Sequence, residues 1–204
     1  MLEENRFDKL AESWDESPMR RLLSSSAAKA IREIVPLHPE MKALDYGCGT
    51  GLVLLHLHGD LKEVVGMDLS KGMIEVLQKK VKEAGILNVR AETHNMDTDP
   101  LPLNTFDLMF SSMALHHIHK PEVYFQKAFL SLKSGGYLCT GDLEEEDGSF
   151  HPEDADYHHQ GFSLDYIRNI MEDVGFKDIQ IQISCKVEKN DKIYPVFMAV
   201  GKKP

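Results

Sequence analysis

The sequence predicts an α/β fold in which a seven-stranded, mostly parallel sheet carries helices on both faces. Three observations indicate this fold: short apolar segments alternate with helical segments over residues 42–143, three glycines follow the first apolar segment, and two alternating segments close the chain. Strands that alternate with helices are joined by right-handed crossovers, so the first five strands are expected to run parallel. The length of 204 residues fits one domain.

Residues 1–38 are expected to form N-terminal helices. The first helix carries an apolar stripe at spacings of three and four residues, which is typical of one buried helical face. The members of this stripe are Phe7, Leu10, Ala11 and Trp14. A second helix is expected to begin at Pro18, with Ser17 as its cap, and to end before Pro36.

The alternating region supplies the parallel strands and the helices between them. Strands are predicted at residues 42–47, 63–68, 88–93, 106–111 and 137–142. Helices are predicted at residues 52–55, 71–84, 121–133 and 163–174. Residues 178–187 and 192–200 form the last two strands, with only a short turn between them. They are expected to form an antiparallel hairpin, with the last strand antiparallel, because a parallel return needs a long crossover.

Three glycines at alternate positions directly follow the first strand. Gly47, Gly49 and Gly51 mark a backbone that turns tightly against a nucleotide-like ligand at the start of a helix, as in Rossmann-like folds. A dinucleotide loop needs the spacing Gly-x-Gly-x-x-Gly, and here Leu52 occupies the third glycine position. The spacing therefore counts against a cofactor that contains a pyrophosphate.

Asp68 ends the second strand, about twenty residues after the glycine loop. A carboxylate at this position accepts hydrogen bonds from both hydroxyls of a ribose. The alternative is that Asp68 only caps the following helix, although Ser70 is available for that role. We therefore favour ribose binding for Asp68.

Further segments extend the pattern on both sides of the loop and Asp68. The segments are residues 8–15, 44–51, 64–70, 95–97, 101–107, 115–118 and 132–138. In this order they resemble the class I S-adenosylmethionine-dependent methyltransferases, most closely the small-molecule type that includes the ubiquinone and menaquinone biosynthesis enzymes. The resemblance covers residues 6–143. It implies a single methyltransferase domain over residues 1–204, with an N-terminal helical lid and a small-molecule methyl acceptor.

The resemblance also implies a binding site for S-adenosylmethionine, with S-adenosylhomocysteine as the product. The residues implied in cofactor binding are Asp45, Gly47, Gly49, Gly51, Asp68, Leu69, Met73, Asn95, Met96, Asp97, Ser111 and Ser112. In this assignment Asp45 lies near the amino group, Asp68 holds the ribose hydroxyls, and Asp97 accepts a hydrogen bond from the adenine amino group.

Other implied roles concern the adenine and the sulfonium. Leu69 and Met73 would flank the adenine, and Ser111 or Ser112 would line the floor under the sulfonium. The backbone of the three loop glycines would approach the methionine part and the ribose. Met73 also fits a plain helix-core position.

Histidines are the candidates for catalysis. Methyl transfer depends mainly on holding the nucleophile in line with the methyl group, and a general base is needed only for a protonated nucleophile. His117, after the fourth strand, is one candidate base, with a pocket-wall role as the alternative. His158 is the other, within residues 144–162, which form either a solvated acidic loop or a substrate lid that turns His158 or His159 toward the acceptor.

No metal site is predicted from these histidines. His116 and His119 share a helical spacing, but the sequence places no carboxylate at a ligand spacing beside them. The cysteines, Cys48, Cys139 and Cys185, are too far apart for a zinc or redox pair, which favours reduced thiols and a cytoplasmic location.

The composition disfavours several partners. A formal net charge of -10 argues against nucleic acid and against anionic membranes. The N-terminus is charged, so no signal peptide is expected, and no apolar run has the length of a membrane span. The oligomeric state is not predicted.

Two alternatives to a methyltransferase stay open at this point. The same fold could bind S-adenosylmethionine without transferring its methyl group, as a regulatory or assembly module. An NAD-dependent oxidoreductase is the other alternative, which the displaced third glycine disfavours. Formation of S-adenosylhomocysteine with an acceptor separates the first alternative from an enzyme, and binding of NADH tests the second.

Overall fold

The structure is a computed structural model that describes residues 6–96, 98–151 and 157–204. Within these ranges seven strands form one sheet in the order β3-β2-β1-β4-β5-β7-β6. The strands are β1 (Lys42–Tyr46), β2 (Glu63–Asp68), β3 (Val89–Thr93), β4 (Phe106–Ser112), β5 (Leu132–Leu143), β6 (Lys177–Lys189) and β7 (Lys192–Lys202). Strands β1 to β5 pair in parallel, whereas β7 runs antiparallel to β5 and β6. The predicted fold class is confirmed, including the antiparallel last strand.

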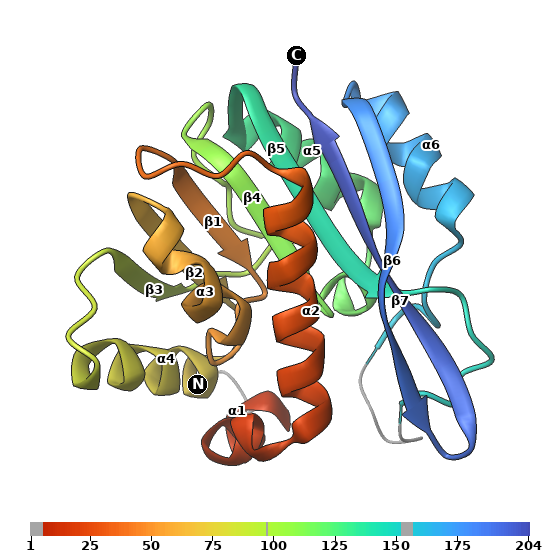
Figure 1. Cartoon of the computed structure of the whole chain (residues 1–204), viewed down its shortest axis with the longest axis horizontal. Helices are drawn as coiled ribbons and strands as arrows, with labels where there is room; N and C mark the ends of the chain where they lie inside the picture. The colour runs from red at the N-terminus through yellow and green to blue at the C-terminus, as the bar shows by residue number, and fades with distance from the viewer. Residues whose placement is uncertain (1–5, 97, 152–156) are drawn as a thin grey trace.

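Helices cover both faces of this sheet (Figure 1). The α-helices are α1 (Arg6–Leu10), α2 (Pro18–Ile34), α3 (Leu52–Leu57), α4 (Lys71–Glu83), α5 (Pro121–Ser131) and α6 (Leu164–Val174). Short 3-10 helices are η1 (Ala11–Glu16), η2 (His58–Asp60) and η3 (Leu115–His117). None of the helices in the described ranges is both long enough and apolar enough to cross a membrane.

The central strands are apolar on both faces. Ala43 and Leu108 pack into the cluster under α2, α3 and α4, while their neighbours Leu44 and Met109 pack into the cluster under α5 and α6. Side chains alternate between the two faces of a strand, so one strand serves two cores. This double burial explains why the strands read as nearly continuous apolar runs in the sequence.

Parallel pairing brings the carboxyl ends of β1, β2 and β4 to one edge of the sheet. In Figure 1 this edge lies at the bottom, where α1 also lies, and the C-terminus projects from the opposite edge. Ligands of open α/β sheets bind at the carboxyl edge. The N-terminal segment is therefore placed against the edge where a ligand is expected.

The first predicted helix is interrupted in the structure. α1 ends at Leu10 and continues as the 3-10 segment η1. The side chain of Arg20 donates to the Trp14 carbonyl at 3.1 Å, and that of Arg21 donates to the Asp15 carbonyl at 2.6 Å. These carbonyls bind α2 side chains, so the N-terminal segment is tied to α2.

The start of β5 also differs from the prediction. The helix α5 ends at Ser131, and β5 begins at Leu132 rather than at residue 137. Leu132 pairs with Phe106, after which the register shifts. Gly135 lies within the shifted segment with a φ of 82°, which is accessible to glycine. Gly135 thus belongs to an irregular strand.

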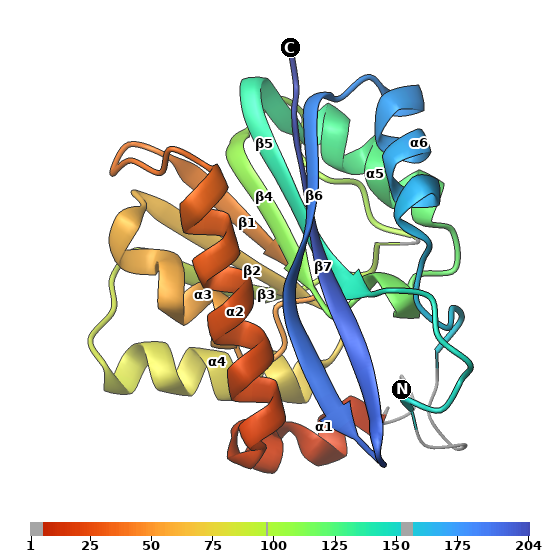
Figure 2. The same cartoon turned by 45° about the vertical axis from the view of Figure 1, so that its right-hand side comes forward.

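The hairpin of β6 and β7 is longer than predicted. Asn190 and Asp191 form its two-residue turn with φ angles of 52° and 57°, as a type I′ turn requires. Figure 2 shows this hairpin extending past the end of β5 to the level of α1. Its far end packs into a third apolar cluster. The buried members of this cluster are Leu23, Leu143, Phe150, Val187, Tyr194 and Val196.

Candidate functional site

A cavity of about 420 Å³ opens at the carboxyl edge of the sheet. Its walls come from the glycine loop, the ends of β2 and β4, the N-terminal segment and the residues after β5. Lys189, at the end of β6, also lines it. A cavity of this size, with few polar groups among apolar walls, is typical of a small-molecule site.

The glycine loop is tied to the end of β2. The backbone N–H groups of Gly47 and Cys48 donate to the Met67 carbonyl at 2.8 and 3.0 Å. Gly47 holds a φ of +69°, and a Cβ there would lie 2.4 Å from the Cβ of Ala114. Only glycine therefore fits where the loop crosses the segment after β4.

Asp68 anchors the same loop from the end of β2. Its Oδ2 accepts from the Gly49 N–H and its Oδ1 from the Ser70 N–H, both at 2.8 Å. The hydroxyl of Ser70 accepts from the Met73 N–H and caps α4, so the capping role does belong to Ser70. Asp68 lines the cavity, and burial raises the pKa of its carboxyl. Each of its oxygens has a further lone pair for a ligand.

Asp45 supplies a second carboxylate at this end of the cavity. It is buried at 2% exposure, and its Oδ2 has no hydrogen-bond partner among the described residues. Burial, followed by the charge of Asp68, raises its pKa well above the ordinary range. A buried acceptor without a partner is costly, and a cationic ligand group would satisfy it.

The implied adenine side is partly assembled. Leu69, Met73, Asn95 and Met96 line the cavity, whereas Asp97 lies outside the described residues. Met73 is only 1% exposed, so it serves as helix core and cavity wall at once.

Two implied residues lie apart from the cavity. Ser112 lines it, but its neighbour Ser111 does not and is buried in β4. Gly51 does not line it either, because it precedes α3 and faces α4. The absence of a Cβ at Gly51 allows close packing on Leu77 of α4.

Gly51→Ala is therefore expected to lower the melting temperature more than Gly85→Ala. Both glycines have positive φ, +83° and +64°, so alanine strains either backbone. A Cβ on Gly51 would also lie 2.4 Å from Leu77 Cδ1, whereas nothing lies within 4 Å at Gly85. Overpacking of this kind adds about 1–3 kcal/mol of destabilisation. Thermal unfolding measures the difference, and equal melting temperatures would contradict the packing role.

One histidine after β4, His116, is held by a carboxylate that the sequence did not predict. His116 Nδ1 lies 2.8 Å from Asp142 Oδ1, and the His116 N–H donates to Asp142 Oδ2 at 3.1 Å. Both side chains are buried, and His116 lines the cavity. Burial acts to raise the pKa of Asp142, but the charge and hydrogen bonds of His116 hold it below the usual value. The pair forms because Asp142, the penultimate residue of β5, lies next to η3.

The structure places the two candidate bases differently. His117 lines the cavity, in edge-to-face contact with Phe7 at 5.1 Å between ring centroids. His158 does not line it and stacks on His119 at 3.5 Å. This placement does not support the alternative in which His158 turns toward the acceptor, because its ring packs against the segment after η3.

His151 is the cavity histidine of the segment after β5. Its ring lies 4.7 Å from that of His116, and it lines the cavity together with Phe150. Burial, together with nearby positive charge, lowers the pKa of His151 to about 4, so its imidazole is neutral at neutral pH. Among the described residues, no group of three or more His, Cys, Asp and Glu side chains is arranged to hold a metal ion.

The N-terminal segment closes the remaining side of the cavity. Phe7, Leu10 and Trp14 line it, and Arg20 stacks on Trp14 at 3.6 Å. The carboxylate of Asp8 accepts from the Ser70 hydroxyl at 2.6 Å and from the Gly72 N–H at 2.8 Å. An acidic side chain at the start of α4 is favourable for that helix. These contacts fasten α1 over the site.

Comparison with known proteins agrees with this architecture. Residues 43–136 match a family described as Methyltransferase domain. The chain is 31% identical over 156 residues to an uncharacterised methyltransferase of Schizosaccharomyces pombe, covering 69% of this chain and 55% of that protein. It is 35% identical over 98 residues to a demethylmenaquinone methyltransferase of a Geobacillus species, covering 47% of this chain and 42% of that protein. The chain thus spans about half the length of these curated relatives.

A solved structure shares the fold. Phosphoethanolamine N-methyltransferase 2 of Haemonchus contortus, in complex with S-adenosyl-L-methionine, superposes with a TM-score of 0.74 at 18% identity. The match covers 88% of this chain and 52% of that one. The sheet order, the glycine loop and these matches define a class I methyltransferase fold. The chain belongs to the class I S-adenosylmethionine-dependent methyltransferases, whose cofactor is S-adenosylmethionine.

Proposed function

We propose that this protein transfers the methyl group of S-adenosylmethionine to a small-molecule acceptor. The observation that carries the proposal is that one cavity joins two carboxylates beside a glycine loop, Asp45 and Asp68, to a buried histidine–aspartate pair. The carboxylates suit a cationic, ribose-containing ligand, and the histidine suits a reacting group that must lose a proton. The cavity volume of about 420 Å³ favours an acceptor of small size.

The chain's own residues fit the cofactor. The unpartnered Oδ2 of Asp45 would accept from the ammonium group, and Asp68 would accept from the ribose hydroxyls. Asn95 and Met96 would lie along the adenine. Arg20 is suited to the methionine carboxylate, because it stacks on Trp14, whose Nε1 lies 3.9 Å from a Cβ built on Gly49.

We assign the role of general base to His116. Bound S-adenosylmethionine supplies an electrophilic methyl group on a sulfonium. His116 Nδ1 is engaged by Asp142, which fixes the ring and leaves Nε2 as the nitrogen for the nucleophile's proton. His117 packs against Phe7 and serves as a cavity wall. His151, with its pKa of about 4, is too weakly basic for this role at neutral pH.

Binding of S-adenosylhomocysteine is expected to release a proton from Asp45. The pKa of the free carboxyl is raised, whereas the ligand's ammonium group favours the ionised form. Affinity is therefore expected to rise with pH until it passes the raised pKa of Asp45, and then to level off. Calorimetric titrations in phosphate and in Tris, whose ionisation enthalpies differ, measure this proton release as up to about one proton per site.

Asp45→Asn provides the comparison for this titration. Its amide has no carboxyl proton to release, so the heats in the two buffers should become equal after correction for the ligand. Asp107→Asn, at the opposite end of β4, should behave as the unmodified protein. Equal proton release by the unmodified protein and Asp45→Asn would contradict the assignment of Asp45 to the ammonium group.

A further inference from the structure

Charge is unevenly distributed around the cavity. The carboxylates among the described lining residues are Asp45 and Asp68, both at the strand ends beside the glycine loop. The cations come from elsewhere and form a basic wall: Arg6 from α1, Arg20 from α2 and Lys189 from the hairpin. Because the acidic part and Arg20 suit the cofactor, Lys189 is the cation left for the acceptor.

Lys189 is the cation that the hairpin brings to this wall. It is half-buried, its ammonium donates to the Phe150 carbonyl, and it lies 5.0 Å from the centroid of the Phe150 ring. No carboxylate of the described residues forms an ion pair with it, whereas nearby Lys192 pairs with Asp147 at 2.6 Å. An ammonium has three donors, so Lys189 retains donors for a ligand.

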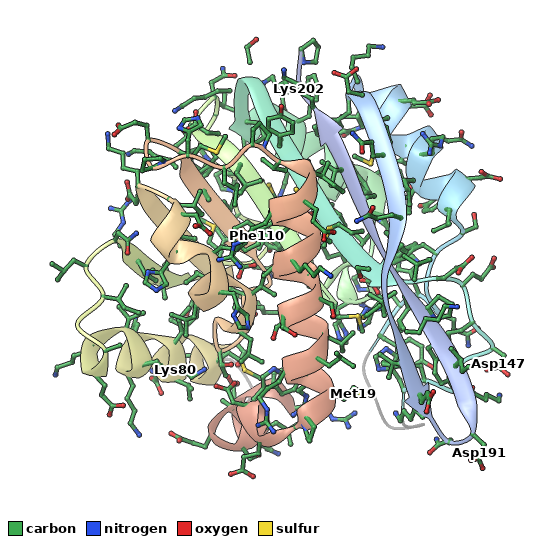
Figure 3. The ribbon with its side chains drawn as sticks, in the orientation of Figure 1. Met19, Lys80, Phe110, Asp147, Asp191 and Lys202 are labelled. Carbon is green, nitrogen blue, oxygen red and sulfur yellow. The ribbon has the colours of Figure 1, made fainter. Side chains whose placement is uncertain are left out.

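The surroundings of Lys189 are apolar. Met19, Leu23, Met113 and Phe150 line the cavity, and all four belong to or pack against the cluster that the hairpin forms with α2. Figure 3 shows Met19 near the start of α2 on the side of the hairpin, with Asp191 at the hairpin turn. A charge beside apolar walls interacts more strongly with a ligand than it would in water.

The field of this wall acts on the neighbouring histidine. After burial and the charge of His116, the positive charges of Lys189 and Arg6 also lower the pKa of His151. The chain as a whole carries a net charge of -10, so a basic wall in its cavity opposes the overall potential. Such a local reversal of sign favours an anionic ligand group at this point.

We propose that the methyl acceptor has an apolar body and an anionic group, a carboxylate, sulfonate or phosphate, that binds Lys189. The proposal rests on the proposed methyltransferase function. It assigns Lys189 as a specificity-determining residue, while His116 receives the proton of the reacting group. The apolar body would lie along Met19, Leu23 and Phe150.

Two fluorescent probes test this proposal with the S-adenosylhomocysteine-saturated protein. 8-Anilinonaphthalene-1-sulfonate carries an anionic sulfonate, and N-phenyl-1-naphthylamine has the same rings without it. The sulfonate probe is expected to bind about tenfold more tightly than the neutral probe, which is the gain in affinity that one charged hydrogen bond supplies. Lys189→Met should remove about this tenfold advantage and leave the neutral probe unaffected.

Two further variants make the outcome specific. Lys186 lies on the same strand but away from the cavity, so Lys186→Met should keep the preference for the sulfonate probe. Lys189→Arg retains a cation at this position and should keep the preference as well. Any of three results would overturn the proposal. The unmodified protein could bind both probes with equal affinity, the sulfonate probe could fail to bind, or Lys189→Met could lose the same affinity for both probes. Binding of S-adenosylhomocysteine is measured before the probes are added. A protein that does not bind S-adenosylhomocysteine is thereby distinguished from one that binds it but shows no preference for the anionic probe.

Discussion

Asp68→Ala is expected to weaken the binding of S-adenosylmethionine and S-adenosylhomocysteine at least about a hundredfold. Hydrogen bonds to a charged group contribute about 1.5–3 kcal/mol each, and Asp68 would supply two to the ribose. The substitution also removes the acceptors of the Gly49 and Ser70 N–H groups, so the glycine loop loses its anchor to β2. Calorimetric titration of both ligands measures the loss.

Asp107→Ala is the matched control for Asp68→Ala. The carboxylate of Asp107 also accepts from a backbone N–H, that of Lys42 at 2.9 Å, but near the start of β4 and away from the cavity. This variant should lose some stability and keep its affinity for both ligands. Unchanged affinity in Asp68→Ala would show that the ribose assignment is wrong, since folding is monitored in both variants.

Asp142→Ala is expected to reduce the free energy of unfolding by about 3–5 kcal/mol. Asp142 is fully buried and accepts from three donors: the N–H and ring Nδ1 of His116 and the N–H of Leu143. Each buried donor left unsatisfied costs about 1–3 kcal/mol. Denaturant unfolding measures the loss. Asp147→Ala, which removes an exposed carboxylate, should leave the unfolding free energy almost unchanged.

The pH dependence of stability provides a second readout for Asp142. Its pKa is lower in the folded protein than in the unfolded chain. Its contribution is therefore fully present above the unfolded value of about 4 and is lost as pH falls through the folded value. Asp142→Asn should lose this acid-dependent contribution. An unchanged slope of stability against pH in the variant would contradict the pairing with His116.

The sequence predicted the cofactor end of the site better than the acceptor end. Gly47, Gly49 and Asp68 are close in sequence to their strands, and parallel strands bring their carboxyl ends to one edge whatever the exact register. Gly51 has the same spacing as the other two glycines, but it packs on Leu77. The spacing of the glycines does not show whether the absence of a Cβ makes room for a ligand or for a neighbouring helix.

The acceptor end depends on contacts between distant segments. Asp142 reaches His116 because the β4–β5 register places Ser112 opposite Gly141, and a single sequence does not reveal that register. A polar residue at the end of a buried strand was the available signal. Lys189 reaches the cavity only because β6 extends two residues beyond its predicted end.

The histidines of residues 144–162 show the same limit. The sequence left open whether this segment is a solvated acidic loop or a substrate lid, and in the structure Phe150 and His151 line the cavity. Which histidine faces inward is decided by tertiary contacts: His158 donates its backbone N–H to the His116 carbonyl at 2.9 Å and stacks on His119. No periodicity within the segment predicts that choice.

The most direct test of the methyltransferase account is the accumulation of S-adenosylhomocysteine. The protein is incubated with S-adenosylmethionine and a mixture of small metabolites, because a cavity of about 420 Å³ is of small-molecule size. The account predicts that S-adenosylhomocysteine forms in proportion to enzyme and that His116→Asn, folded and still able to bind S-adenosylmethionine, loses most of this formation. Saturable binding of S-adenosylmethionine without any formation of S-adenosylhomocysteine would contradict it and indicate a binding module instead.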